Sequence, residues 1–140
     1  MITVIYTCRK DDADLVEHES VVNSHEEVCQ IVDNYPWSSE LVLSEEMGEG
    51  GGFWFILGNP KNKSATYQLV PMEHHKGLLD LSVVLKPGFM NLFGKKTVSK
   101  SFDLVAIEEV KAKVKELFDH SVDSLYKKYK TEITLSVKNI

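Results

Sequence analysis

Residues 40–70 read ELVLSEEMGEGGGFWFILGNPKNKSATYQLV, and this stretch decides the expected fold. β-rich runs divided by strong turn residues are typical of consecutive antiparallel strands, so the stretch predicts a three-stranded meander. Its parts are an apolar alternating segment (40–44), an acidic glycine-rich turn (45–52), an aromatic segment (53–57), a second turn (58–63) and a third segment (64–70).

The length and composition predict a single folded domain over residues 1–140. A content of 43% hydrophobic and 26% charged residues argues against a disordered or fibrous chain. Cys8 and Cys29 lack CxxC or Cys/His spacing, so buried free thiols in a reducing cytosol are expected rather than a bridge or a ligand pair. The first residues carry no basic region, and no apolar run approaches the roughly 18 residues that span a bilayer. The sequence therefore predicts a cytoplasmic protein without a membrane partner.

The net charge of −5 hides a split along the chain. Residues 1–50 hold 12 Asp and Glu against 2 Lys and Arg, a balance of −10, whereas residues 51–140 hold 9 against 14, a balance of +5. If the early segments share a face, that face repels nucleic acid and attracts a basic partner. If folding interleaves the charges, no net field survives. The lysines are dispersed and lack interleaved aromatic residues, so nucleic acid is not an expected partner.

Periodicity predicts further elements on both sides of the opening stretch. Ser24 and Glu27 form a capping box, in which each side chain is expected to accept from the other's backbone N–H. The apolar stripe behind them runs as far as a proline and predicts a helix over 24–35. A second stripe predicts a helix over 104–119, capped by Asp103. The other expected elements are strands at 2–6, 78–85 and 95–102, a short helix at 121–130 and a polar turn at 11–19. Residues 131–137 either form a strand that closes the edge of the sheet or are an irregular tail.

Together these elements predict an α+β domain. The sheet is expected to be mainly antiparallel with five to six strands, and two or three helices, among them 24–35 and 104–119, should pack on one face. Trp37 is expected to anchor the corner between the first helix and the meander. The apolar loop at 89–94 either plugs the end of the sheet or forms an exposed contact patch.

No arrangement of residues predicts catalysis. A serine or cysteine nucleophile needs a base and an orienting acid, and no serine lies in a nucleophile-elbow sequence. Glu45 and Glu46 are consecutive residues beside a predicted strand, so their side chains should face opposite sides and not act as an acid/base pair. The chain is not expected to be an enzyme.

Metal and cofactor sites are not expected either. The carboxylates at 11–14 lack the glycine and glutamate that a calcium-binding loop requires at its sixth and twelfth positions. His74 and His75 have no third ligand at suitable spacing and are interpreted as a surface pair. Gly48-x-Gly50 lies between predicted strands beside carboxylates, whereas a phosphate-binding loop needs a strand-to-helix context without such charge.

Four groups of residues, in the order of these elements, carry a resemblance to a known family. They are Ser24-His25-Glu26-Glu27 with Val28 and Ile31; Leu41-Val42-Leu43 with Glu45, Glu46 and Gly48; Phe53 to Gly58 with Ala65-Thr66-Tyr67; and Val98 to Ser101 with Ile107, Val110, Val114 and Phe118. With them the chain resembles the first-described family of immunity proteins from bacterial polymorphic toxin systems, a group often encoded beside deaminase and other nucleic-acid-attacking toxins. The resemblance covers roughly residues 22 to 119, and the chain differs from the family in residues 11–19 and after His120.

The resemblance implies a protein that neutralises the C-terminal domain of a cognate toxin, such as a nuclease or a deaminase, by tight stoichiometric binding. An acidic inhibitor surface would mimic phosphate charge and speed association with a basic toxin. The alternative is a non-catalytic adaptor or regulator of another protein. Trp54, or Phe53, is either an aromatic anchor or part of the core. The candidate partner-binding residues are Glu45, Glu46, Glu49, Asp11, Asp12, Asp14 and Trp54.

Overall fold

A computed structural model describes residues 1–10, 14–48, 50–86, 94 and 96–138 of the chain. Within that part, six strands form one antiparallel sheet and the helices contact it, so the predicted α+β fold class is confirmed. The strands are β1 (Ile2–Lys10), β2 (Asp14–Val22), β3 (Phe53–Gly58), β4 (Ser64–Glu73), β5 (Lys76–Lys86) and β6 (Lys96–Ala106). The helices are α1 (His25–Asn34), α2 (Trp37–Met47), α3 (Ile107–Val114), α4 (Glu116–Asp119) and α5 (Val122–Lys138).

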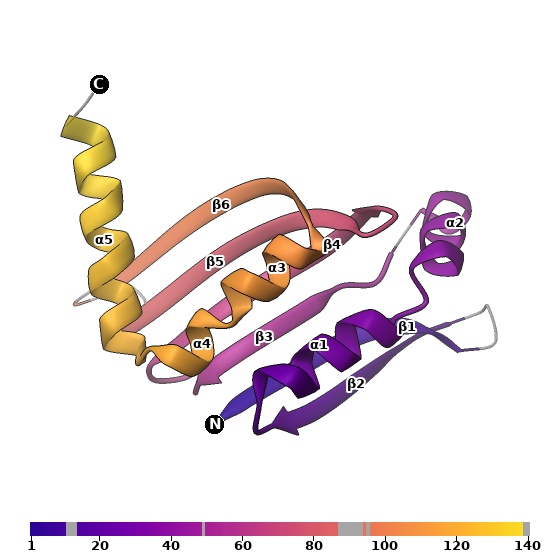
Figure 1. Cartoon of the computed structure of the whole chain (residues 1–140), viewed down its shortest axis with the longest axis horizontal. Helices are drawn as coiled ribbons and strands as arrows, with labels where there is room; N and C mark the ends of the chain where they lie inside the picture. Colours follow the sequence, from indigo (N-terminus) through magenta and orange to yellow (C-terminus); the bar gives the residue numbers. More distant parts are fainter. Residues whose placement is uncertain (11–13, 49, 87–93, 95, 139–140) are drawn as a thin grey trace.

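The sheet has the strand order β2-β1-β3-β4-β5-β6. Strands β3 to β6 each pair with the next in sequence and form a meander. β1 pairs with β2 on one side and with β3 on the other, with Ile5 opposite both Glu19 and Trp54. Figure 1 shows α1, α3 and α4 on one face of the sheet, α2 at one end and α5 at the opposite end.

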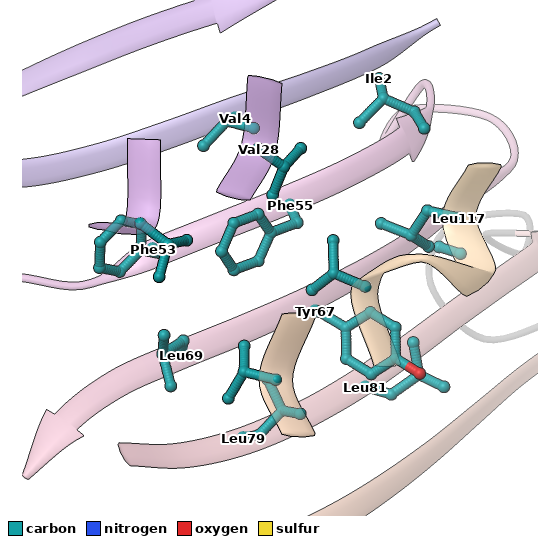
Figure 2. Close-up of a cluster of buried hydrophobic side chains, with 14 of the residues drawn as sticks. Ile2, Val4, Val28, Phe53, Phe55, Tyr67, Leu69, Leu79, Leu81 and Leu117 are labelled. Carbon is teal, nitrogen blue, oxygen red and sulfur yellow. The ribbon is translucent and has the colours of Figure 1, made fainter. Parts of the chain in front are cut away.

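The core lies between the sheet and the helices on its covered face. Strand residues alternate between the two faces, and the inward set includes Phe53, Phe55 and Tyr67, all fully buried. Figure 2 shows these side chains gathered beneath Val28 of α1 and Leu117 of α4. Burial of aromatic and branched apolar side chains is the main favourable term in folding, so this layer holds the helices on the sheet.

The start of α1 differs in one bond from the predicted capping box. Ser24 Oγ accepts from the backbone N–H of Glu27 at 3.3 Å, as expected. The Glu27 carboxylate, however, accepts from the backbone N–H of Asn23 at 3.1 Å instead of returning to Ser24. The helix ends at Asn34, two residues before Pro36, as the sequence predicts.

The predicted strand at 40–44 is wrong, because these residues lie in helix α2. The three-residue run LVL is too short to separate strand from helix by periodicity. Two tertiary contacts decide the conformation. The Trp37 ring is buried and stacks on Phe53 with ring centres 6.0 Å apart, and Glu40 accepts from the backbone N–H and guanidinium of Arg9 at 2.6 and 3.0 Å. Pro36 before the helix and Gly48 (φ +76°) after it are the start and stop residues that the sequence offers.

Two further predictions are wrong near the ends of strands. Residues 14–22 form strand β2 instead of a polar turn, because an edge strand tolerates carboxylates on its solvated side. Asp103 does not cap a helix: with φ +60° it lies at a bulge in β6, the strand continues to Ala106, and α3 begins at Ile107.

Residues 131–137 form neither the edge strand nor the irregular tail that the sequence allows, since α5 continues to Lys138. Its apolar residues Tyr126, Tyr129 and Ile133 recur at helical spacing on the side facing the core. Thr134 Oγ1 donates to the carbonyl of Lys130 within the same helix, at 2.9 Å. The alternation of Ile133, Leu135 and Val137 along the sequence therefore does not indicate a strand.

Cys8 and Cys29 are free thiols, and both are half-buried rather than buried. Burial raises the pKa of each thiol. The apolar segment at 89–93 lies outside the described residues. In the described part of the chain, no helix has both the length and the apolar character needed to cross a bilayer.

Candidate functional site

The acidic first part of the chain gathers on one side of the molecule. β2 and β1 form one edge of the sheet, α1 packs near them and α2 lies at the end beyond β1 (Figure 1). Asp33 of α1 pairs with Lys111, whereas the other exposed carboxylates of these elements make no ion pair with another described residue, and we call those unpaired carboxylates the acidic side. The acidic side consists of Asp14, Glu17, Glu19, Glu26, Glu45 and Glu46.

The structure brings some of the predicted site residues together. Glu45 and Glu46 lie exposed in the last turns of α2, on a helix and not on the expected hairpin turn. Asp14 begins β2, and the neighbouring Leu15 lies opposite Arg9 of β1. The Arg9 guanidinium contacts α2, with 3.2 Å between its Nε and the Met47 sulfur. The start of β2 and the end of α2 are therefore adjacent. Asp11, Asp12 and Glu49 lie outside the described residues.

The sheet has a second face that α1, α3 and α4 leave uncovered, here called the open face. The register places side chains of successive strands in rows across it. One row is Glu19, Ile5, Trp54, Gln68, Asp80 and Ser101, and the next is Val21, Thr3, Ile56, Thr66, Ser82 and Ser99. These residues are half-exposed or exposed, so no described element packs over them.

Trp54 therefore lies outside the core. Its neighbours Phe53 and Phe55 point inward and are fully buried, and the pleat turns the indole between them to the open face. Gly52 lies beside this ring, and a Cβ at that position would come 3.7 Å from its edge. Of the two expectations for Phe53 and Trp54, core burial holds for the first and not for the second.

Beside Trp54 the open face is hollowed into a groove of about 330 Å³ that crosses β3 to β6. Lys100 belongs to its wall, but its ammonium lies on the covered face, 2.5 Å from Glu132 and 5.2 Å from the Phe102 ring centre. The groove is lined by Trp54, Thr66, Gln68, Asp80, Leu81, Ser82, Ser99, Lys100 and Ser101.

Several polar side chains of this groove are not used by the fold. The side chains of Gln68, Asp80, Ser82 and Ser99 make no hydrogen bond or ion pair within the described part of the chain. Neither row carries Lys or Arg, and the charged residues in the two rows are Glu19 and Asp80. The groove thus presents hydrogen-bond acceptors and negative charge beside an aromatic ring.

A polar cluster on the covered face joins β4, α4 and α5. Glu116 Oε2 accepts from the hydroxyls of Tyr129 at 2.7 Å and Tyr67 at 3.3 Å, and Oε1 accepts from Lys128 at 3.0 Å. Burial alone would raise the Glu116 pKa, but the bonds from Tyr129 and Lys128 outweigh it and hold that pKa below its ordinary value. Burial raises the pKa of both tyrosines. These hydrogen bonds hold α5 against the sheet. No local sequence pattern predicts the cluster.

Two hydroxyl–imidazole contacts between described residues have the form of a catalytic pair. In the first, Ser124 Oγ lies 3.1 Å from Nδ1 of His120, and the second is formed by Ser38 and His74. Ser38 Oγ lies 3.2 Å from Nδ1 of His74, and both residues are exposed at the end of the sheet near α2. Ser38 and His74 line a surface pocket that Asp33 also borders. The Asp33 carboxylate accepts a hydrogen bond from the Lys111 ammonium at 2.6 Å, and it does not orient the imidazole of His74. Among the described residues, no group of three or more His, Cys, Asp or Glu is placed to hold a metal ion.

Comparison of this chain with protein-family models, with curated proteins and with solved structures found no match. The resemblance to immunity proteins stays a prediction.

Proposed function

We propose that this chain is a binding protein that neutralises a basic protein partner, as an immunity protein neutralises the C-terminal domain of a nuclease or deaminase toxin. One observation carries the proposal. The acidic side has no ion-pair partners among the described residues, and it adjoins an open face whose half-exposed aromatic ring, Trp54, is next to free acceptors.

The negative charge of the acidic side suits a basic protein partner. Toxins that attack nucleic acids are basic where substrate binds, so a surface of carboxylates attracts that site and raises the association rate. Once the two proteins are in contact, a few anchor residues supply most of the binding energy. A half-exposed tryptophan beside a groove is a typical anchor. The proposal needs no catalytic group in this chain.

The test begins with the protein domain encoded directly before the gene for this chain, which the proposal predicts to be a toxin. That domain is produced in a host that it kills, with and without the full chain. We expect growth to be restored, and the two purified proteins to elute together as a one-to-one complex. Persistence of toxicity, or separate elution of the two proteins, would contradict the proposal.

A pull-down from the native host with the tagged chain supplies a second route. Recovery of the C-terminal domain of one large secreted protein, identified by mass spectrometry, agrees with the proposal. Recovery of housekeeping proteins alone would favour a non-catalytic adaptor instead.

A further inference from the structure

We infer that the open-face groove receives an arginine side chain of the protein partner, with its guanidinium against the Trp54 indole and hydrogen-bonded to Asp80. The inference deepens the proposed function and rests on it in one respect, namely that the partner is a protein. It names the chemistry of the group that enters the groove and the residues that hold it.

The register of the sheet sets the dimensions of the site. Trp54, Gln68 and Asp80 follow one another in a single row across β3, β4 and β5. Adjacent strands are about 4.8 Å apart, so roughly 10 Å separates the backbone at Trp54 from that at Asp80. A planar group placed over Gln68 would contact the aromatic ring on one side and the carboxylate on the other.

The polar lining matches a guanidinium. That group carries five N–H donors and no acceptor, so a fitting site must present several acceptors in a small space. The Asp80 carboxylate, the Gln68 carbonyl and the hydroxyls of Ser82 and Ser99 are acceptors, and the described part of the protein leaves all of them free. Trp54 makes no ring or cation contact with another described residue, which leaves its indole available for stacking.

Other occupants fit the same surface less well. An anion finds no lysine or arginine in the two rows that cross the groove. A lysine ammonium is a compact, strongly hydrated charge, which gains less than a planar guanidinium from an aromatic wall. A second copy that presented its own open face would bring Glu19 and Asp80 against the same carboxylates.

The first experiment titrates the full chain with N-acetyl-arginine methylamide and follows backbone amide and indole NMR signals. We expect shifts at Trp54, Gln68 and Asp80. The citrulline analogue, which has the same shape without the charge, and the lysine analogue should bind several-fold more weakly. The Trp37 indole is the internal control, because it is buried and donates to the Val32 carbonyl at 2.9 Å. Absence of shifts at Trp54, or equal binding of citrulline, would overturn the inference.

Substitution separates the groove from other exposed carboxylates. Asp80→Asn should weaken binding of the arginine amide about tenfold, the size expected for one charge-assisted hydrogen bond. The matched control is Glu109→Gln, which removes an exposed carboxylate of α3 and should leave affinity unchanged. Both carboxylates are exposed and make no hydrogen bond or ion pair with another described residue, so neither change should alter folding. Equal affinities for the two variants would contradict the inference.

The same variants distinguish this inference from the proposed function. If the wild-type chain neutralises its toxin and Asp80→Asn and Trp54→Leu do so with the same affinity, the groove assignment is wrong and the function stands. If the arginine amide binds at Trp54 but no toxin is neutralised, the assignment stands and the function fails. Self-association in sedimentation that Trp54→Leu abolishes would assign the groove to a second copy and overturn the inference.

Discussion

At the scale of single residues, Glu40 shows how one side chain fixes an element. It accepts two hydrogen bonds from Arg9, and the side chains of Arg9 and Glu40 are 1% and 4% exposed. Removing one partner of a buried ion pair is costly, because the remaining charge loses its compensation while staying out of water. The pair thereby joins α2 to β1.

We predict that Glu40→Ala lowers the free energy of unfolding by about 3 kcal/mol, the lower end for breaking a buried ion pair. Glu45→Ala on the same helix is the matched control. Its exposed carboxylate makes no ion pair with another described residue, and its change should stay within about 0.5 kcal/mol. Urea unfolding followed by circular dichroism measures both values. Equal losses in the two variants would contradict the structural role of the pair.

The Glu116 carboxylate makes stability depend on pH in the acid range. Its pKa is lowered in the folded protein, so its contribution is fully present above the ordinary carboxyl pKa of about 4.3 and disappears as the pH falls through the lowered value.

We predict that Glu116→Gln flattens the loss of stability between about pH 5 and about pH 2, because glutamine does not titrate. Urea midpoints measured at several pH values compare this variant with the wild type and with Glu109→Gln, an exposed carboxylate of α3 without an ion pair in the described chain. If Glu109→Gln flattened the curve as much as Glu116→Gln, the cluster would not be the source of the pH dependence.

At the scale of elements, the sequence predicts what periodicity and caps encode and misses what distant contacts decide. Helix α1 and strands β3 to β5 carry long regular patterns and strong turn residues, and they are found close to where they were expected. Helix α2 was missed because its conformation depends on burial of Trp37 and on Arg9, neither visible in a local pattern. β2 was missed because an edge strand needs apolar residues on one side only.

The same distinction applies to the candidate site: local alternation predicts some of its features, and the pairing of distant strands decides the others. Period-two alternation could have placed Trp54 outward, because Phe53 and Phe55 compete for the same core face. Asp80 could not have been joined to Trp54 from the sequence, since their common row depends on the pairing of three strands. Glu45 was placed on the surface correctly but on the wrong element.

At the scale of the whole molecule, the strand order turns the charge split along the chain into a split in space. The acidic early elements form the β2 edge and the adjoining end, while the lysine-rich later elements form the β6 side. Charges on one side act together at distances up to about one Debye length, near 8 Å at physiological ionic strength. A basic partner of the kind proposed would therefore be attracted before any contact forms.

We predict that Glu45→Lys/Glu46→Lys slows association with the basic partner more than tenfold at low salt and changes the dissociation rate less, because exposed charges away from the buried contacts act mainly on encounter. Raising the salt concentration should shrink the difference. Surface-plasmon measurements give both rates. The control, Glu108→Lys/Glu109→Lys, reverses two exposed carboxylates of α3, which contacts β6; an equal effect there would show that net charge, not its position, matters.

The position of β1 in the sheet has a consequence for the time course of folding. β3 to β6 are consecutive hairpins, so their pairings close short loops, whereas the pairing of Ile5 with Trp54 must first enclose β2, α1 and α2. Long closures slow folding because their entropy is lost before contacts form. Pulsed hydrogen exchange during refolding should protect the amides of β4 and β5 before those through which β1 pairs with β3, whereas the β1–β2 hairpin closes a short loop of its own. The acidic elements β1, β2, α1 and α2 would then pack last, against a lysine-rich meander β3–β6 that is already folded.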